Sequence, residues 1–319
     1  MTREIFMAIL QKKISVVAPC YKESANIRAL YGRVKAVLEA NTADWEIIFV
    51  DNASPDNSEE IFRVLAAEDR RVKVIFFSRN FGHSQYGYAA GTEYASGDAV
   101  VWIDGDLQDP PELISEFIKK WEEGYDVIYG VRERRKGSML LRGAYRIFYR
   151  LFKKMSYLDI PLDAGDFSLI DRKVVDVINA MPERDRYMRG LRTWAGFRSI
   201  GISYTRLERG GGVTSNNWRR NIWWAKKAIF SFSYAPLEFI FYLSLGVFLL
   251  TVIAIVAYII AYFINPGPRG FTTILLAVLF LGSCQLLALS VIAEYTGKIF
   301  EETKRRPKYI VREILNDRR

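Results

Sequence analysis

The segment AVVWIDGDLQDP, residues 99–110, joins an apolar run to three acidic residues. Residues 99–103 are apolar, which predicts a buried strand. Asp104 and Asp106 follow at a spacing of two, so their side chains share one face of an extended segment. In open α/β sheets, ligands bind at the edge where such strands end, and carboxylate oxygens suit Mg²⁺ or Mn²⁺. The segment therefore predicts a site for a metal and a diphosphate, with an ordinary Asp-Gly turn as the alternative.

The rest of the first half of the chain alternates predicted strands and predicted helices. The other strands cover residues 14–18, 45–50 and 72–77, and the helices cover residues 24–40, 56–67 and 85–95. One more predicted helix, from Pro111 to about Gly124, and one more predicted strand, at residues 126–129, follow. This order predicts an α/β fold with a doubly wound, mostly parallel sheet.

Hydrophobic residues make up 50% of the 319 residues, and two long apolar stretches lie in the last third of the chain. Residues 237–263 carry a single charge, Glu238, and residues 271–293 carry none. Each stretch exceeds the roughly 20 residues that cross a bilayer. Buried core helices are the alternative, but two such stretches joined by the short connector 264–270 favour a transmembrane hairpin. The N-terminal apolar run, residues 5–10, is too short for a signal peptide.

Positive charge flanks both apolar stretches. The basic residues are Arg219, Arg220, Lys226 and Lys227 before the first stretch and Lys298, Lys304, Arg305, Arg306 and Lys308 after the second, whereas the connector has only Arg269. The positive-inside rule therefore places both ends of the hairpin, and a catalytic domain at residues 1–216, in the cytoplasm. We expect an integral protein of a bacterial-type inner membrane with a cytoplasmic basic tail at residues 294–319. Cys20 and Cys284 would be unpaired thiols, one in each part.

Two further segments combine basic and apolar residues at helical spacing, residues 138–155 and residues 217–233. Both are predicted to be amphipathic helices in the membrane interface, with ordinary packing on the sheet as the alternative. The net charge of +9 would suit either nucleic acid or an anionic membrane. Because the charge clusters beside the apolar stretches, it favours a membrane surface and an anionic substrate over nucleic acid.

Several motifs together resemble one enzyme family. They are VAPCYKE (17–23), VDNASPD (50–56), SRNFG (78–82), DGDLQDPP (104–111), GDF (165–167) with DR (171–172), PERDR (182–186), and AEY and KRRP in the tail (293–307). The set is similar to membrane-anchored, inverting glycosyltransferases of family 2 with the GT-A fold. Within these it most resembles the polyprenyl-phosphate glycosyltransferases, namely bacterial undecaprenyl-phosphate glucosyltransferases and dolichol-phosphate mannose synthases. The resemblance covers nearly the whole chain in family order.

The resemblance implies roles for particular residues. Nucleotide-sugar binding would involve Pro19, Tyr21, Glu23, Asp51, Arg79 and Asp104. The metal, Mg²⁺ or Mn²⁺, would be held by Asp104, Asp106 and Gln108, and the catalytic residues would be Asp106 and Asp166. Asp166 would orient the acceptor or take a residual proton, because a phosphate monoester with a second pKa of about 6 is already largely anionic. A turn cap before a strand is the alternative for Asp166, and a loop or helix-start position is expected for His83.

Two arginines near the end of this domain complete the expected site. Arg206 and Arg209 would contact the acceptor phosphate or the donor diphosphate, because Arg grips phosphates bidentately. Relatives commonly have a Ser/Thr-Lys-Tyr run just beyond, but this chain has Ser215-Asn216-Asn217. A lysine contact to phosphate is therefore not expected at that point.

The resemblance implies an enzyme that moves a sugar from a nucleotide-sugar to a polyprenyl phosphate at the cytoplasmic membrane face. Glucose from UDP-glucose and an undecaprenyl-type acceptor are the first choice, and GDP-mannose or another nucleotide-sugar is the alternative. A processive polysaccharide synthase usually has a Gln-x-x-Arg-Trp motif and more membrane spans, whereas this chain has Arg192-Thr193-Trp194 and one predicted hairpin. A non-enzymatic scaffold would be expected to lose its metal carboxylates, whereas Asp104 and Asp106 are both present. The implied partners are the two substrates, the membrane, a second copy of the chain in a homo-oligomer, and a downstream flippase and transferase, with no nucleic acid.

Overall fold

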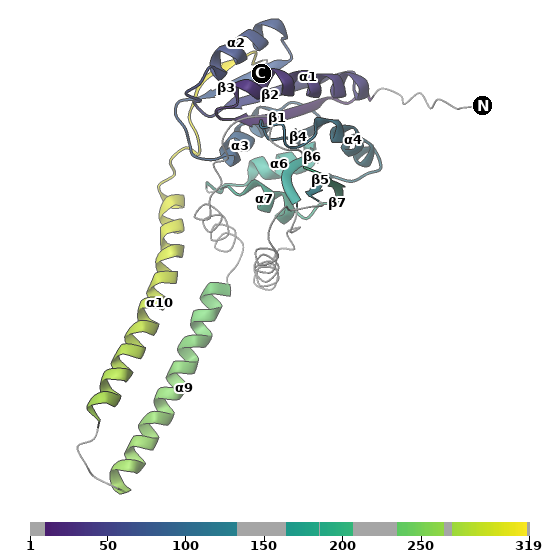
Figure 1. The fold of residues 1–319 in the computed structure, drawn as a ribbon. Helices are drawn as coiled ribbons and strands as arrows, with labels where there is room; N and C mark the ends of the chain where they lie inside the picture. Colours follow the sequence, from purple (N-terminus) through teal and green to yellow (C-terminus); the bar gives the residue numbers. More distant parts are fainter. Residues whose placement is uncertain (1–9, 133–163, 185, 207–234, 265–269, 318–319) are drawn as a thin grey trace. The chain divides into compact units, whose positions relative to one another are not determined.

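The strand predicted at residues 99–103 lies inside an eight-stranded sheet (Figure 1). The computed structural model describes residues 10–132, 164–184, 186–206, 235–264 and 270–317. Two compact units share the chain: residues 1–149, 158–217 and 306–319 form the first, and residues 150–157 and 218–305 form the second. The predicted interfacial helices at residues 138–155 and 217–233 lie outside the described residues.

The sheet is mixed, with a parallel centre. Its strands are β1 (Ile14–Cys20), β2 (Trp45–Asp51), β3 (Val72–Phe77), β4 (Ala99–Trp102), β5 (Val127–Arg132), β6 (Ala164–Asp171), β7 (Ser199–Tyr204) and β8 (Val311–Leu315), in the order β7-β5-β6-β4-β1-β2-β3-β8. β1 pairs in parallel with β2 and β4, β2 with β3, and β5 with β7. β6 is antiparallel to β4 and β5, and β8 is antiparallel to β3. The predicted α/β class and parallel core are confirmed, and the antiparallel strands are additions to them.

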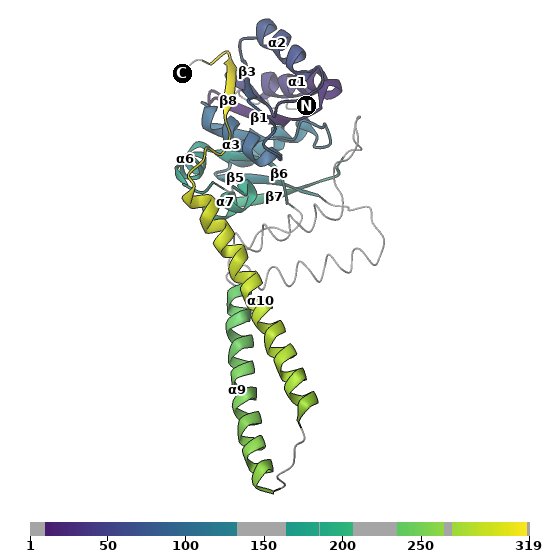
Figure 2. The same cartoon turned by 90° about the vertical axis from the view of Figure 1, so that its left-hand side faces the viewer.

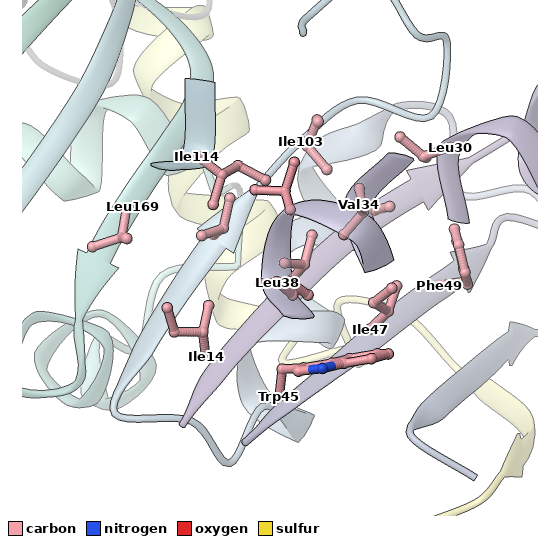
Figure 3. Packing of buried hydrophobic residues seen from close by; sticks show 14 of the residues in the cluster. Ile14, Leu30, Val34, Leu38, Trp45, Ile47, Phe49, Ile103, Ile114 and Leu169 are labelled. Atoms are coloured by element: carbon pink, nitrogen blue, oxygen red, sulfur yellow. The ribbon is translucent and has the colours of Figure 1, made fainter. Parts of the chain in front are cut away.

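Helices cover both faces of the sheet, as a doubly wound fold requires. On one face, α1 (Ser24–Asn41), α2 (Ser58–Glu68) and α4 (Ile114–Glu122) share an apolar core with alternate residues of β1 and β2. The apolar positions expected to face the sheet from α1 are buried. Figure 3 shows Leu30, Val34 and Leu38 of α1 against Ile47 and Phe49 of β2. The first helix therefore packs on the strand that ends in Asp51, and both are fixed by the same core.

The opposite face carries α3 (Ser84–Tyr94), which contacts β1 directly and also contacts α6 (Arg172–Ala180) and α7 (Met188–Trp194). Two glycines of α3 allow the close approach. A Cβ at Gly91 would lie 2.2 Å from Cγ1 of Val17, and one at Gly87 would lie 2.7 Å from Cβ of Pro19. Only glycine leaves room for the strand at these two positions. The close contact fixes the end of β1, where the predicted nucleotide site begins.

The second unit contains two long helices, α9 (Ala235–Ile264) and α10 (Phe271–Thr303), which lie side by side (Figures 1 and 2). Among the described residues, one stretch is long and apolar enough to cross a membrane, Pro236–Ala254 in α9, with a mean hydropathy of 2.2. α10 continues ten residues beyond the predicted boundary at residue 293, because the polar residues that follow are compatible with a helix.

Residues 311–315 return to the first unit as β8, a strand that the sequence analysis did not predict within its basic tail at residues 294–319. β8 extends the sheet beside β3, and ion pairs fasten it: Arg63 to Glu313 at 2.5 Å and Arg312 to Glu59 at 2.7 Å. Asn316 donates from Nδ2 to the carbonyl oxygens of Ala66 and Val72. Residues 311–317 are therefore part of the first unit, although they follow α10 in the chain.

Candidate active site

The loops that follow β1, β2, β3 and β4 meet at one edge of the sheet, because these strands run parallel. Three of the loops contain a residue other than glycine with a positive φ angle: Lys22 at 59°, Ala53 at 53° and Leu107 at 58°. Such angles cost energy and cluster at ligand sites, where surrounding contacts enforce them. The edge therefore has the backbone geometry of a binding site, and it contains most of the predicted site residues.

The predicted nucleotide-binding residues gather in the first two loops. Asp51 is buried at the end of β2, and both of its carboxylate oxygens accept from the backbone N–H of Ser54 at 3.2 Å. Burial raises the pKa of Asp51 above its ordinary value, and the hydrogen bonds from Ser54 oppose this. Glu23 is also buried and accepts from Nδ2 of Asn26 at 2.6 Å. Tyr21 is 39% exposed beside them, so an aromatic ring and two carboxylates adjoin the same edge.

Hydrogen bonds connect the first three loops. The backbone N–H of Lys22 donates to Oγ of Ser54 at 3.1 Å, which joins the loops after β1 and β2. Oδ1 of Asn52 accepts from the backbone N–H of Phe81 at 2.9 Å, which joins the loops after β2 and β3. The guanidinium of Arg79 lies 4.1 Å from the centre of the Phe81 ring. These links hold Arg79 and the nucleotide-binding candidates in one rigid edge.

His83 does not belong to the charged part of the site. It directly precedes α3, as the sequence analysis expected, and its ring stacks on Tyr86 with 4.9 Å between the ring centres.

The aspartates after β4 form the acidic part of the edge. Tyr88 donates from its hydroxyl to Oδ1 of Asp104 at 2.7 Å, and the backbone N–H of Gln108 donates to Oδ1 of Asp106 at 3.1 Å. Burial, followed by repulsion from Asp109, Asp106 and Asp166, raises the pKa of Asp104 to about 7. The part of this shift that comes from Asp109, Asp106 and Asp166 reflects the negative charge gathered at this edge.

Among the residues that the structure describes, Arg206 is the cation nearest to Asp104 and Asp106. Its Nη2 lies 4.0 Å from Oδ2 of Asp104 and 3.6 Å from Oδ2 of Asp106, and its Nε lies 3.4 Å from Oδ1 of Asp109. Arg206 stands two residues after the end of β7, so the acidic loop and this guanidinium come from distant parts of the chain. Sequence analysis placed Arg206 in the site as a phosphate contact. Its partner residue in that expectation, Arg209, lies outside the described residues.

Asp109 is a site residue to which the sequence analysis gave no role. It is buried, accepts a short hydrogen bond from the Tyr204 hydroxyl, and lies 3.8 Å from Nη2 of Arg132. Arg132 in turn donates from Nε to the Tyr204 oxygen at 3.2 Å. The only available signal was the position of Asp109 inside the DGDLQDPP motif, because Arg132 and Tyr204 belong to no recognised motif.

Asp166 lies inside β6, so the alternative of a turn cap before a strand is wrong. Its Oδ2 accepts from Nη2 of Arg189 at 3.3 Å, and Arg192 donates to the backbone carbonyls of Gly165 and Asp166. Burial, the largest influence, raises the pKa of Asp166, but Arg189, Arg192 and Arg132 outweigh it and hold the pKa below the ordinary value. Asp166 is therefore ionised at neutral pH and is a weak base. Arg189 and Arg192 were also missed by the sequence analysis.

The donor set of the edge fits a hard divalent cation. Asp104 and Asp106 supply carboxylate oxygens, and Oδ2 of buried Asp109 has no hydrogen-bond partner within the described part of the chain. No group of three His, Cys, Asp or Glu side chains among the described residues is arranged to hold an ion alone. Mg²⁺ is commonly bound by one or two carboxylates together with substrate phosphates, and Asp104 and Asp106 are carboxylates of that kind.

Comparison with known proteins identifies the fold with a family. Residues 15–178 match the model of "Glycosyl transferase family 2". The chain is 41% identical over 301 residues to "Uncharacterized glycosyltransferase YkcC" of Bacillus subtilis, covering 93% of this chain and 92% of that protein. It is 38% identical over 304 residues to "Bactoprenol glucosyl transferase" of Shigella phage SfV, covering 94% and 98%.

The solved structures to which the chain is similar include glucosyl-3-phosphoglycerate synthase from Mycobacterium tuberculosis, in complex with Mn²⁺, uridine-diphosphate and phosphoglyceric acid. It is 16% identical, with a TM-score of 0.47 and coverage of 69% of this chain and 76% of that one. The family match and the full-length relatives confirm the expected enzyme class, a hexosyltransferase. The chain belongs to glycosyl transferase family 2.

Proposed function

We propose that this chain transfers glucose from UDP-glucose to a polyprenyl phosphate of the undecaprenyl type, with inversion at the anomeric carbon. One observation carries the proposal: carboxylates and guanidinium groups alternate along one sheet edge, from Asp104 and Asp106 through Arg206 and buried Asp109 to Asp166 with Arg189. Such an edge suits two phosphate-bearing substrates and a divalent cation. The end-to-end similarity to a bactoprenol glucosyl transferase supports the choice of sugar and acceptor.

The donor nucleotide would bind in the loops after β1 and β2. The carboxylates of Glu23 and Asp51 are acceptors, and they suit the N–H of a base and the hydroxyls of a ribose, which are donors. Pro19 lies in β1 and Tyr21 directly follows it, beside those two carboxylates. Arg79 adjoins them on the next loop, where its positive charge suits the anionic donor.

The donor diphosphate would lie against Asp104 and Asp106. A Mg²⁺ or Mn²⁺ ion bound there, with Gln108 nearby, would neutralise the diphosphate as it leaves. Arg206 would supply further positive charge from the opposite side of the acidic loop. The protein itself contributes orientation, and charged contacts at partly buried groups are stronger than in bulk water.

The acceptor would be positioned by Asp166 and the arginines around it. An acceptor phosphate oxygen forms a bond to the anomeric carbon while the bond from that carbon to the donor diphosphate breaks, and the electron pair leaves with the nucleoside diphosphate. A polyprenyl phosphate is already largely anionic at neutral pH, so it needs little deprotonation. Asp166, an ionised carboxylate held by Arg189, therefore orients the acceptor through that guanidinium and is not required as a strong base.

The membrane setting follows from the nature of the acceptor. A polyprenyl phosphate stays in the bilayer, so the catalytic domain, residues 1–216 with 306–319, would work at the cytoplasmic face. Residues 237–263 and 271–293 would cross the membrane, and residues 138–155 and 217–233 would lie in its interface. The chain would act as a homo-oligomer, and a flippase and a further transferase would use the lipid-linked sugar.

A donor and acceptor panel tests this function. Purified full-length protein in lipid nanodiscs would be given UDP-glucose, UDP-N-acetylglucosamine or GDP-mannose, each with undecaprenyl phosphate and Mg²⁺. We expect one product, a lipid carrying a single glucose, together with one equivalent of UDP. Preference for GDP-mannose would instead support the mannose alternative. A growing polysaccharide, or UDP release without a lipid product, would contradict the proposal.

A further inference from the structure

The guanidinium of Arg206 shares its positive charge among three carboxylates. Its closest contacts are 3.4 Å to Asp109, 3.6 Å to Asp106 and 4.0 Å to Asp104. These distances are longer than those of paired hydrogen bonds. Arg33, by comparison, holds Glu112 with contacts of 2.9 Å and 2.7 Å. Arg206 is thus held by electrostatic attraction to several carboxylates and not by a pair of short hydrogen bonds to one carboxylate.

We propose that Arg206 is an internal counter-ion that a divalent metal displaces from Asp104 and Asp106, and that the displaced guanidinium then binds a substrate phosphate. The inference rests on the proposed function insofar as it requires a metal-dependent reaction at this edge. It assigns Arg206 two successive partners, first the carboxylates and then a phosphate. Arg206 therefore neutralises the carboxylates before the metal binds, and it changes its partner when the metal binds.

Charge makes the exchange necessary. A divalent ion and a guanidinium cannot use the same oxygens of Asp104 and Asp106, because two cations a few ångströms apart repel strongly at a partly buried site. The side chain of Arg206 is 28% exposed, so it has room to leave. The metal carries twice the charge of the guanidinium, and it suits hard carboxylate oxygens better.

Asp109 keeps the displaced guanidinium close to the site. Its Oδ1 contacts Nε of Arg206, at the stem of the guanidinium, while the contacts to Asp104 and Asp106 are made by the terminal Nη2. Asp109 is itself fixed, because the Tyr204 hydroxyl donates to it and Arg132 lies 3.8 Å away. The terminal nitrogens can therefore turn away from the metal while the stem stays paired. Freed nitrogens in a planar fork suit a phosphate.

The exchange couples the binding of metal and phosphate. By thermodynamic linkage, the factor by which the metal changes the affinity for phosphate equals the factor by which phosphate changes the affinity for the metal. Without substrate, Arg206 opposes the metal, so removing its charge makes the metal bind more tightly. This direction distinguishes the inference from a purely structural role for Arg206, whose loss would leave metal binding unchanged or weaker.

Metal titration of the full-length protein tests the first half. Mn²⁺ binding would be measured without substrate, by the loss of the free-ion electron paramagnetic resonance signal, for wild type, Arg206→Gln and Arg189→Gln. We expect Arg206→Gln to bind Mn²⁺ on the order of tenfold more tightly, within the usual range of coupling. Arg189→Gln removes an equal charge beside Asp166 and should change the affinity less than twofold. Equal or weaker binding by Arg206→Gln would overturn the inference.

Phosphate binding tests the second half and identifies the source of the phosphate. Affinities for farnesyl phosphate and for UDP would be measured with and without saturating Mn²⁺. If the acceptor phosphate is the second partner, Mn²⁺ strengthens farnesyl phosphate binding in wild type but not in Arg206→Gln. If it is the donor diphosphate, Arg206→Gln instead weakens UDP binding at saturating Mn²⁺. If neither effect is observed, the displaced guanidinium does not bind a substrate phosphate, and the second half of the inference is wrong.

A third variant separates failure of the inference from failure of the function. Asp104→Asn with Asp106→Asn should abolish Mn²⁺ binding. If wild type binds no Mn²⁺ even with UDP, the metal-dependent function itself is wrong. If wild type binds Mn²⁺ and only the Arg206→Gln effect is missing, the function stands and the counter-ion role does not.

Discussion

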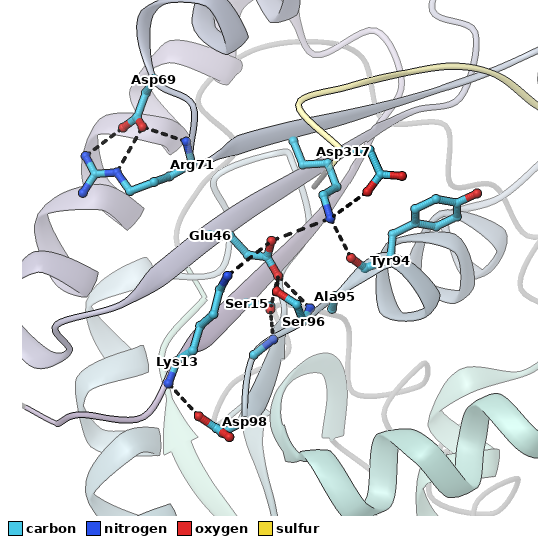
Figure 4. A network of polar contacts seen from close by, with 12 residues as sticks. Lys13, Ser15, Glu46, Asp69, Arg71, Tyr94, Ala95, Ser96, Asp98 and Asp317 are labelled. Atoms are coloured by element: carbon cyan, nitrogen blue, oxygen red, sulfur yellow. Dashed lines mark hydrogen bonds and ion pairs between the residues drawn. The ribbon is translucent and has the colours of Figure 1, made fainter. Parts of the chain in front are cut away.

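Two groups of carboxylates lie at opposite ends of the same parallel strands, and they differ in how completely they are neutralised. At the amino-terminal ends, Oε1 of Glu46 accepts from Oγ of Ser15 and from the backbone and hydroxyl of Ser96, at 2.7–2.9 Å. Its other oxygen lies near Lys73 and Lys13, and Lys73 also reaches Asp317 (Figure 4). At the carboxyl ends, within the described part of the chain, Asp104 accepts from Tyr88 and Asp106 from the backbone of Gln108, and the two share the charge of Arg206.

The pKa values of the two groups shift in opposite directions. Burial raises the pKa of Glu46, but hydrogen bonds from Ser15 and Ser96 and the charges of Lys73 and Lys13 outweigh it, so the net pKa is lowered. Burial and neighbouring carboxylates raise the pKa of Asp104 to about 7. A buried carboxylate with all its partners stabilises a fold, whereas one that lacks them retains affinity for a cation. The comparison separates a structural cluster from a functional one within a single sheet.

The largest expected effect concerns the functional cluster. Asp106→Ala should lower turnover by at least about a hundredfold, because metal stabilisation of a leaving diphosphate is worth several kcal/mol. UDP release from UDP-glucose with undecaprenyl phosphate would measure it. EDTA should abolish wild-type activity, and Mg²⁺ or Mn²⁺ should restore it. The melting temperature should stay within a few degrees of wild type, and full activity in EDTA would refute the metal assignment.

The structural cluster should give the opposite result. Glu46→Ala removes one of the two carboxylates beside buried Lys73, at 3.8 Å, and leaves Asp317 at 3.5 Å; breaking a buried ion pair typically costs about 3 kcal/mol. For a domain of this size that corresponds to a melting temperature lower by roughly 6–12 °C. Turnover per folded molecule at low temperature should be unchanged, because Glu46 lies at the far end of the strands. Loss of activity without loss of stability would show that the two clusters are not separate.

The two clusters should also respond oppositely to pH. Because the pKa of folded Glu46 is depressed, its contribution is present above its ordinary pKa near 4.5 and is lost as pH falls through the lower, folded value. Asp104 has a raised pKa, so the metal-free protein should lose stability as pH rises from about 4 to about 7.

Asp104→Asn removes this second dependence. In EDTA at pH 8 the variant should be more stable than wild type by about 1 kcal/mol, a few degrees in melting temperature. Melting curves from pH 4 to pH 8 would measure the difference, with Glu46→Gln as the matched control, which should be less stable than wild type throughout. A destabilised Asp104→Asn at pH 8 would show that the acidic edge is already neutralised without metal.

The local sequence was enough to predict the parallel core and the sheet edge at which several candidate site residues lie. Apolar runs near the length of one strand, separated by amphipathic helices, predicted β1 to β4, and the carboxylates Asp51, Asp104 and Asp106 directly follow or end such runs. Because parallel strands end at a common edge, their convergence followed from topology alone. The positions that the sequence left without a role are Asp109, Arg132, Arg189 and Arg192, whose partners are distant in the chain.

Only tertiary structure decided which charges meet. Arg206 lies 97 to 102 positions beyond Asp109 and Asp104 in the chain, and no local period connects it with them. The same holds for β8, whose five residues follow a long apolar helix yet complete the sheet beside β3. Local patterns determine the faces of helices and strands because they depend on neighbours within one or two turns. Pairing between distant residues depends on how the whole sheet assembles, and that assembly set the charge of the site.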